Sequence, residues 1–132
     1  MRKCEPVKLT VGDTTSPLVP CAVAMVAKHV VLFKFKPETS PEAIKALEAG
    51  VRSLIRIPGV LSMDFGETFT TERSQGFTHV LVADFESRAT QAVYDPHPLH
   101  VEVVKTLIVP IIAPGGIVVV DIEDPARATA SA

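Results

Sequence analysis

Alternating apolar positions along the chain predict four β-strands. The strands are expected at residues 29–36, 60–69, 77–85 and 117–122. β-Branched and aromatic residues dominate the first, third and fourth of these stretches, which is the composition that strands favour. Successive side chains of a strand point to opposite faces. One face of the first strand therefore carries His29, Val31, Phe33 and Phe35.

Apolar residues with helical spacing separate the strands. Ser40-Pro41 predicts a helix start, because serine is a favoured N-cap and proline at the first helical position loses no hydrogen bond. Pro58-Gly59 predicts the turn that follows this helix. The expected apolar stripe consists of Ile44, Leu47, Val51, Leu54 and Ile55.

A short helical turn over residues 87–93 leads to a second main helix that begins at His97. Pro110 removes a backbone hydrogen bond, so this helix is expected to end near Val109. Gly115-Gly116 predicts a turn before the last strand. The expected inner face of the helix consists of Val101, Val104, Leu107, Ile108 and Ile111.

The predicted order β-α-β-β-α-β is that of an α+β, ferredoxin-like fold with an antiparallel sheet. Two helices cover only one face of such a sheet, yet three of the predicted strands are apolar on both faces. Monomers in solution rarely expose so large an apolar surface. A second copy of the sheet is the simplest cover. The sequence therefore predicts a homodimer whose two sheets pack face to face as a dimeric α/β barrel.

The length of 132 residues fits one domain. The expected divisions are a flexible N-terminal extension over residues 1–24, a domain over 25–123 and a disordered tail over 124–132. A formal net charge of −2 and the lack of a basic cluster argue against a nucleic-acid partner. No apolar run approaches the roughly 20 residues that span a membrane.

The two cysteines, Cys4 and Cys21, form neither a disulfide framework nor a metal motif. A reduced protein of the cytoplasm is therefore expected, with organelle targeting by residues 1–24 as the alternative. The histidines show no HxH or HExxH spacing, so the sequence predicts neither a metal nor a cofactor.

The four histidines of the chain lie where an apolar core would favour other residues. His97 and His100 closely follow Tyr94, whereas His29 and His79 lie in predicted strands. Either these residues form one polar constellation in an apolar pocket, or each makes a structural hydrogen bond. If His97 caps the second helix, His100 lies one turn in, where unpaired backbone N–H groups favour a neutral imidazole. A neutral imidazole can act as a general base.

Four pieces of sequence together resemble the stress-response dimeric α/β-barrel family. The pieces are His29-Val-Val-Leu-Phe-Lys-Phe, Gly76-Phe-Thr-His79, Phe85-Glu-Ser and Tyr94-x-x-His97-Pro-x-His100, within about residues 28–122. One plant member of this family closes a linear polyketide by an intramolecular aldol condensation. The resemblance implies that His100 is a base, that Tyr94 is its partner and that His29 lines the pocket. The phenol can also stabilise a developing enolate oxygen.

The first helix departs from that enzyme, because Ala46 and Gly50 stand where the resemblance implies bulky aromatic pocket walls. The candidate catalytic residues are thus His100 and Tyr94. The candidate ligand-lining residues are His29, Val31, Phe33, Ala46, Gly50, His79, Leu81 and His97.

Three functions stay open at this point. The first is a dimeric stress-response-type protein whose pocket binds a small hydrophobic or phenolic ligand. The second is a cofactor-independent cyclase or aldol-type enzyme that uses His100 and Tyr94. The third is a purely structural oligomer. Small residues in place of aromatic walls favour the first over the second, and no nucleotide loop or nucleophile elbow is present.

Overall fold

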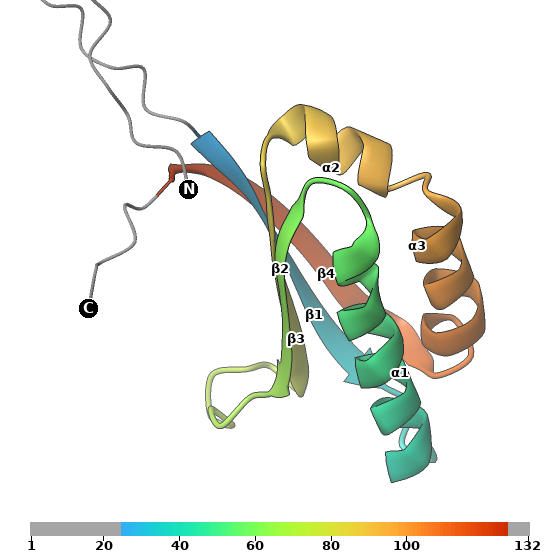
Figure 1. Cartoon of the computed structure of the whole chain (residues 1–132). Helices are drawn as coiled ribbons and strands as arrows, with labels where there is room; N and C mark the ends of the chain where they lie inside the picture. The colour runs from blue at the N-terminus through green and yellow to red at the C-terminus, as the bar shows by residue number, and fades with distance from the viewer. Residues whose placement is uncertain (1–24, 127–132) are drawn as a thin grey trace, which may run out of the picture.

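A computed structural model describes residues 25–126 as a four-stranded antiparallel sheet with helices on one face (Figure 1). The strands, in spatial order, are β2 (Val60–Glu67), β3 (His79–Phe85), β1 (Met25–Phe35) and β4 (Ile112–Pro125). The helices are α1 (Pro41–Ser53), α2 (Arg88–Tyr94) and α3 (Pro98–Val103), with the 3₁₀ turn η1 (Leu54–Arg56) after α1 and the π-helical turn η2 (Val104–Ile108) after α3. The predicted α+β, ferredoxin-like fold is confirmed.

The expected extension over residues 1–24 and residues 127–132 of the expected tail lie outside the described residues. β4 continues to Pro125, two residues past the end expected for the domain.

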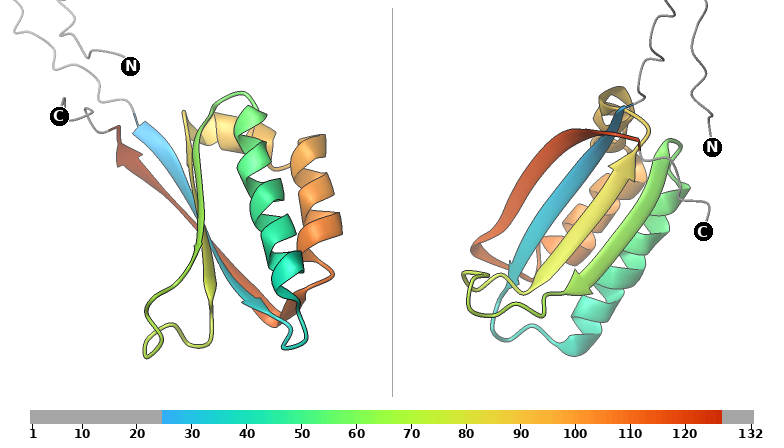
Figure 2. Two further views of the ribbon diagram at one scale, coloured as in Figure 1. Left: turned by 60° about the horizontal axis from the view of Figure 1, so that its bottom comes forward. Right: turned by 90° about the vertical axis from the view of Figure 1, so that its left-hand side faces the viewer.

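The molecule has two layers, which Figure 2 shows from the side and from the sheet. α1 and α3 lie side by side across one face of the sheet, and α2 crosses one end of that face. The buried face of β1 carries Ala27, His29, Val31 and Phe33, as the alternation predicted. These side chains form the floor of the space beneath the helices.

Side-chain caps fix the start of each helix. The Ser40 hydroxyl accepts from the Ala43 N–H of α1 at 3.1 Å, and the Ser87 hydroxyl accepts from the Thr90 N–H of α2 at 3.1 Å. His97 caps α3 through its ring, whose Nδ1 accepts from the Leu99 N–H at 3.1 Å. The helix starts predicted at Ser40 and His97 are confirmed.

The predicted inner face of the second main helix is confirmed at Val104, Leu107, Ile108 and Ile111, which are buried or pack against the core, but Val103 was missed. Val103 and Ile108 are its buried residues, whereas Val101 is only half-buried. After Val103 the helix continues in a π-helical turn, in which the Val109 N–H donates to the Val104 carbonyl five residues back at 2.9 Å. A wider turn rotates the residues after it relative to an ordinary α-helix. The predicted helix end near Val109 is confirmed.

The turn predicted at Gly115-Gly116 is also wrong, because both glycines lie within β4. They belong to an irregular part of the β1–β4 ladder, where Phe33 pairs with Ile117 but Phe35 pairs with Ile112. Gly115 has a φ of 65°, and a Cβ at Gly116 would collide with the Lys34 carbonyl. Both positions thus need glycine, so the pair forms a bulge within the strand.

No helix covers the face of the sheet opposite α1 and α3 (Figure 2). Register places two apolar rows across β3, β1 and β4, Val82–Val30–Val120 and Val80–Leu32–Val118. The next row is Asp84–Lys28–Ile122, in which Lys28 and Asp84 form an ion pair at 3.0 Å. Val118, Val120 and Ile122 are each more than a third exposed. The apolar second face on which the dimer prediction rests is therefore present.

Candidate functional site

An inner cavity of about 240 Å³ lies between the sheet and the helices. Its floor consists of Val31, Phe33 and Leu81, which are buried side chains of β1 and β3. α1 contributes Val51, and the residue after α1 contributes Leu54. Polar groups stand at one end: His29, Gln91, Tyr94, Asp95, His100 and Asp121. An apolar chamber with a few converging polar groups is the usual form of a small-molecule site.

His100 and Tyr94 lie together at this polar end, with ring centroids 4.4 Å apart. His100 Nδ1 lies 2.8 Å from the carbonyl oxygen of Asp95. A carbonyl can only accept, so Nδ1 carries the proton and Nε2 keeps a lone pair. The Asp95 backbone, rather than its carboxylate, therefore sets the tautomer of this ring. The arrangement leaves a basic nitrogen beside a phenol.

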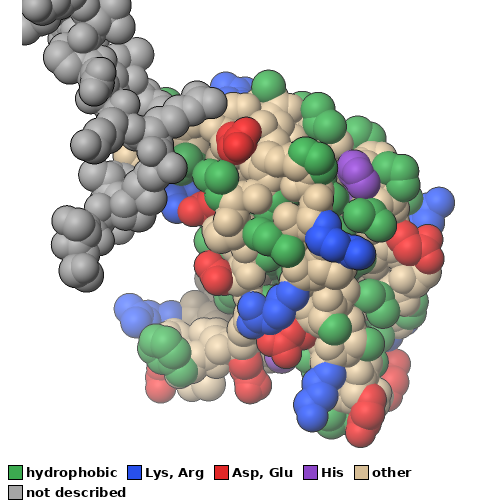
Figure 3. Space-filling view, in the orientation of Figure 1, with side chains coloured by type: hydrophobic (Ala, Val, Ile, Leu, Met, Phe, Trp, Pro, Cys, Tyr) green, Lys and Arg blue, Asp and Glu red, His purple; other side chains and the backbone are tan. Residues whose placement is uncertain are grey.

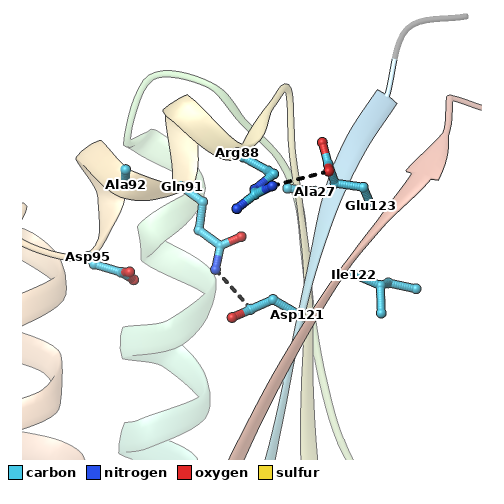
Figure 4. A pocket seen from close by; sticks show the side chains of 8 residues that line it. All are labelled: Ala27, Arg88, Gln91, Ala92, Asp95, Asp121, Ile122 and Glu123. Atoms are coloured by element: carbon cyan, nitrogen blue, oxygen red, sulfur yellow. Dashed lines mark hydrogen bonds and ion pairs between the residues drawn. The ribbon is translucent and has the colours of Figure 1, made fainter.

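His29 lies on the other side of Tyr94, with ring centroids 6.3 Å apart. Its Nδ1 donates to Asp121 Oδ1 across the β1–β4 ladder at 2.6 Å. Gln91 Nε2 of α2 donates to the same Asp121 oxygen at 2.8 Å (Figure 4). The Asp121 carboxylate thereby holds His29 in the tautomer whose Nε2 is free.

Two opposing effects act on Asp121. Burial raises the pKa of its carboxyl, but hydrogen bonds from His29 and Gln91, with the charge of His29, outweigh burial and lower the pKa below its ordinary value. The carboxylate thus stays ionised at neutral pH.

Tyr94 is only 1% exposed. Its ring packs edge-on against Phe85 at 4.7 Å. The phenol oxygen makes no hydrogen bond to another described residue, yet no described side-chain polar atom is both sealed from solvent and unpaired. The oxygen therefore opens onto the cavity that Tyr94 lines. Burial, with the charge of Asp95, raises the pKa of Tyr94 above its ordinary value, so the phenol remains a hydrogen-bond donor at neutral pH.

An alkaline titration is expected to show this directly, because Tyr94 is the only tyrosine and the chain has no tryptophan. An ordinary phenol ionises near about pH 10. The folded state retains a proton that the unfolded chain releases, so stability falls as pH rises above that value. The absorbance of ionised tyrosine should therefore rise only over the pH range in which circular dichroism shows the protein unfolding. Ionisation near pH 10 with the circular dichroism unchanged would contradict the burial of the phenol.

Four of the sequence-based candidates lie outside the cavity. Ala46 is on the exposed side of α1. Gly50 faces α3 and η2, and a Cβ there would clash with Leu107 of η2. Gly50 is thus a site of close helix packing, and Val51 and Leu54 form the α1 side of the wall. His97 is engaged as the α3 cap.

His79 is separated from His29 along the sheet. It pairs with Phe33, four residues beyond His29 on β1, which is about 13 Å at the usual strand rise. Its ring stacks on Phe65 at 5.7 Å. Burial lowers the pKa of His79, partly opposed by the carboxylates of Glu67 and Glu48. The histidines therefore form no single constellation: His29 and His100 share the cavity, while His79 and His97 serve elsewhere.

Sequence reasoning missed Gln91 and Asp121. Asp121 had a signal, because it is a lone charge within the apolar run Ile117–Ile122. Gln91 had a weaker signal: once Ser87 caps α2, residues spaced three or four apart share one face of the helix. Arg88, Gln91 and Asp95 follow that spacing.

Among residues 25–126, His, Cys, Asp and Glu side chains nowhere gather in a group of three or more that suits a metal ion. The helices within the same residues are too short or too polar to cross a membrane. On the face seen in Figure 3, basic side chains stand beside acidic ones and form no continuous basic surface.

The fold and the cavity together define a ferredoxin-like α+β domain with a His/Tyr-lined chamber between sheet and helices. Residues 27–124 match the family described as Stress responsive A/B Barrel Domain, and the chain belongs to that family. The resemblance drawn from the sequence motifs is confirmed.

Two curated relatives and one solved structure show the range of this similarity. The chain is 39% identical over 77 residues to the stress-response A/B barrel domain-containing protein HS1 of Arabidopsis thaliana, covering 57% of this chain and 71% of that protein. It is 32% identical over 79 residues to olivetolic acid cyclase of Cannabis sativa, covering 58% of this chain and 78% of the cyclase. A dimeric ferredoxin-like protein of unknown function from Thermobifida fusca superposes with a TM-score of 0.64 at 22% identity, over 75% of this chain and 91% of that one.

Proposed function

We propose that this chain forms a homodimer whose inner cavity binds a small hydrophobic or phenolic ligand. The observation that carries the proposal is the Tyr94 phenol, which is buried, protonated and without a partner among the described residues. The hydroxyl opens onto the inner cavity, so a ligand oxygen there could accept its hydrogen bond. The dimer follows from the open apolar face of the sheet and agrees with the dimeric relative. A cytoplasmic location is part of the same proposal, since no cysteine lies between residues 25 and 126.

The size and the lining of the cavity define the ligand. A cavity of about 150 Å³ suffices for benzene in another protein, so about 240 Å³ admits one substituted aromatic ring. The apolar walls favour the ring, and the Tyr94 hydroxyl and the free nitrogens of His29 and His100 favour a hydroxyl or carbonyl substituent. A phenol combines both features.

Titration with p-cresol tests the proposal, with toluene as the matched ligand that lacks the hydroxyl. The parent protein is expected to bind p-cresol more tightly than toluene. Tyr94→Phe keeps the ring and removes one hydrogen bond, so the affinity for p-cresol is expected to fall about tenfold. Ala46→Ser, on the exposed side of α1, is the control and should bind like the parent. Equal binding of p-cresol by the parent and by Tyr94→Phe would contradict the role of the phenol.

A second candidate function is cofactor-independent proton abstraction next to a carbonyl group, as in an aldol-type cyclisation. The observation that favours it is the free Nε2 of His100 beside the Tyr94 ring, a base next to a donor for an enolate oxygen. The test is deuterium exchange at the methyl group of acetophenone in D₂O. Exchange should fall about 100-fold or more in His100→Ala and about 100-fold in Tyr94→Phe. Exchange no faster than in buffer would eliminate this candidate and leave the binding function.

A further inference from the structure

A second hollow, the outer recess, adjoins the inner cavity and has about 360 Å³ of space. α2 forms one wall, and the ends of β1 and β4 form the other (Figure 4). Its lining residues are Ala27, Arg88, Gln91, Ala92, Asp95, Asp121, Ile122 and Glu123.

Gln91, Asp95 and Asp121 line both the outer recess and the inner cavity. The two hollows therefore meet at the hydrogen bond between Gln91 and Asp121, which is 2.8 Å long. The Asp121 carboxylate, whose side chain is about half exposed, faces that boundary.

The charges of the outer recess are mainly negative. Asp95, Asp121 and Glu123 supply three carboxylates against the single guanidinium of Arg88. Arg88 lies 3.6 Å from Glu123 (Figure 4), so its charge is already matched. Asp95 and Asp121 then have no arginine of the recess to balance their charges. His29 balances the negative charge of Asp121 only when its ring is protonated.

We infer that the outer recess is the head-group subsite of the inner cavity, and that it selects aromatic ligands with an ammonium head group over those with a carboxylate. This inference rests on the proposed binding function. Like charges a few ångströms apart repel and opposite charges attract, with energies of about 1 kcal/mol or more at 4 Å even in water. A carboxylate in the recess meets Asp95 and Asp121, whereas an ammonium group gains from both.

Tyr94 provides an independent indication that the joined space holds a ligand. Its side chain is 99% removed from solvent at 1% exposure, and its hydroxyl opens into the inner cavity without a partner among the described residues. The acidic side chains of the recess thus stand beside a chamber into which the Tyr94 hydroxyl opens. The apolar chamber and the acidic recess together define a ligand with an apolar ring and a cationic end.

Calorimetric titration of the full chain at neutral pH with benzylamine, benzyl alcohol and benzoate tests the subsite. These ligands share one ring and differ in the head group, which is cationic, neutral or anionic. Benzylamine is expected to bind at least about tenfold more tightly than benzoate, with benzyl alcohol between them. The double variant Asp95→Asn, Asp121→Asn removes the two carboxylates that Arg88 does not match and should shrink the amine-to-benzoate ratio several-fold.

The possible outcomes separate the inference from the function on which it rests. Equal affinities for the three ligands, or tightest binding of benzoate through Arg88, would overturn the subsite and leave the aromatic cavity in place. An unchanged amine-to-benzoate ratio in the double variant would also overturn it. If p-cresol binds and none of the three benzyl ligands does, the subsite is wrong; if no aromatic ligand binds at all, the proposed function is wrong.

Discussion

Val120→Lys is expected to convert the dimer into a monomer. Val120 lies on the open face of the sheet, partway along the edge strand β4, and is 51% exposed within one chain. Its lysine replacement remains solvated in the monomer, so the fold should tolerate it. In a face-to-face dimer the same ammonium group would be buried against apolar side chains, which costs several kcal/mol without a partner. The dissociation constant should rise at least about 100-fold.

Native mass spectrometry or sedimentation at micromolar concentration measures this change. The parent should have twice the chain mass of 14.1 kDa, and the variant should have the chain mass. Val109→Lys is the matched control, because Val109 is 58% exposed and lies after η2, away from the sheet. A monomeric parent, or a Val120→Lys dimer as tight as the parent, would contradict the face-to-face assembly.

Phe33→Ala is expected to cause the largest loss of stability. Phe33 is fully buried, and its ring lies 5.8 Å from Phe35 and 5.9 Å from Phe65. Truncation of a buried phenylalanine typically costs about 3–5 kcal/mol, because transfer energy is lost and a void remains. The effect should be strong here, since Phe33 already borders the inner cavity and the void would extend it.

Thermal melting at one fixed protein concentration is the appropriate measurement, because the stability of a dimer depends on concentration. A loss of this size corresponds to a fall of well over about 10 °C for a domain of this length. Phe69→Ala is the control: the same substitution at a side chain that is 98% exposed should change stability by less than about 0.5 kcal/mol. Similar melting temperatures for the two variants would contradict the packing described for β1.

The strands and helix starts could be predicted because local rules determine them. Alternation alone identified the buried face of β1, and the pair Ser40-Pro41 located the start of α1. The open apolar face was predictable for the same reason, since period-two alternation assigns both faces of a strand at once.

The errors arose where tertiary contacts modify the local rules. Val103 is buried although it lies outside the predicted apolar stripe, and no sequence periodicity reports the π-helical turn that follows it. Gly115 and Gly116 resemble a turn signal in sequence, but the approach of the Lys34 carbonyl makes them a bulge within β4.

The candidate site was predictable only in part, because the sequence does not show which distant residues meet in the folded chain or how deeply each is buried. Tyr94 and His100 are six residues apart, so their proximity follows from the short link between α2 and α3. His29 and Asp121 are 92 residues apart and meet only through the pairing of β1 with β4. His79 shares the strand face of His29 yet lies near the other end of the sheet.

The most direct test of the ligand-binding account is the melting temperature of Tyr94→Phe beside that of the parent. The substitution keeps the ring that packs on Phe85 and removes only the hydroxyl, which has no partner among the described residues. The account predicts an unchanged or raised melting temperature, because a group held ready for a ligand does not stabilise the unliganded fold. A structural hydroxyl would instead contribute about 1–3 kcal/mol, so a fall of several degrees would contradict the account and favour a purely structural oligomer.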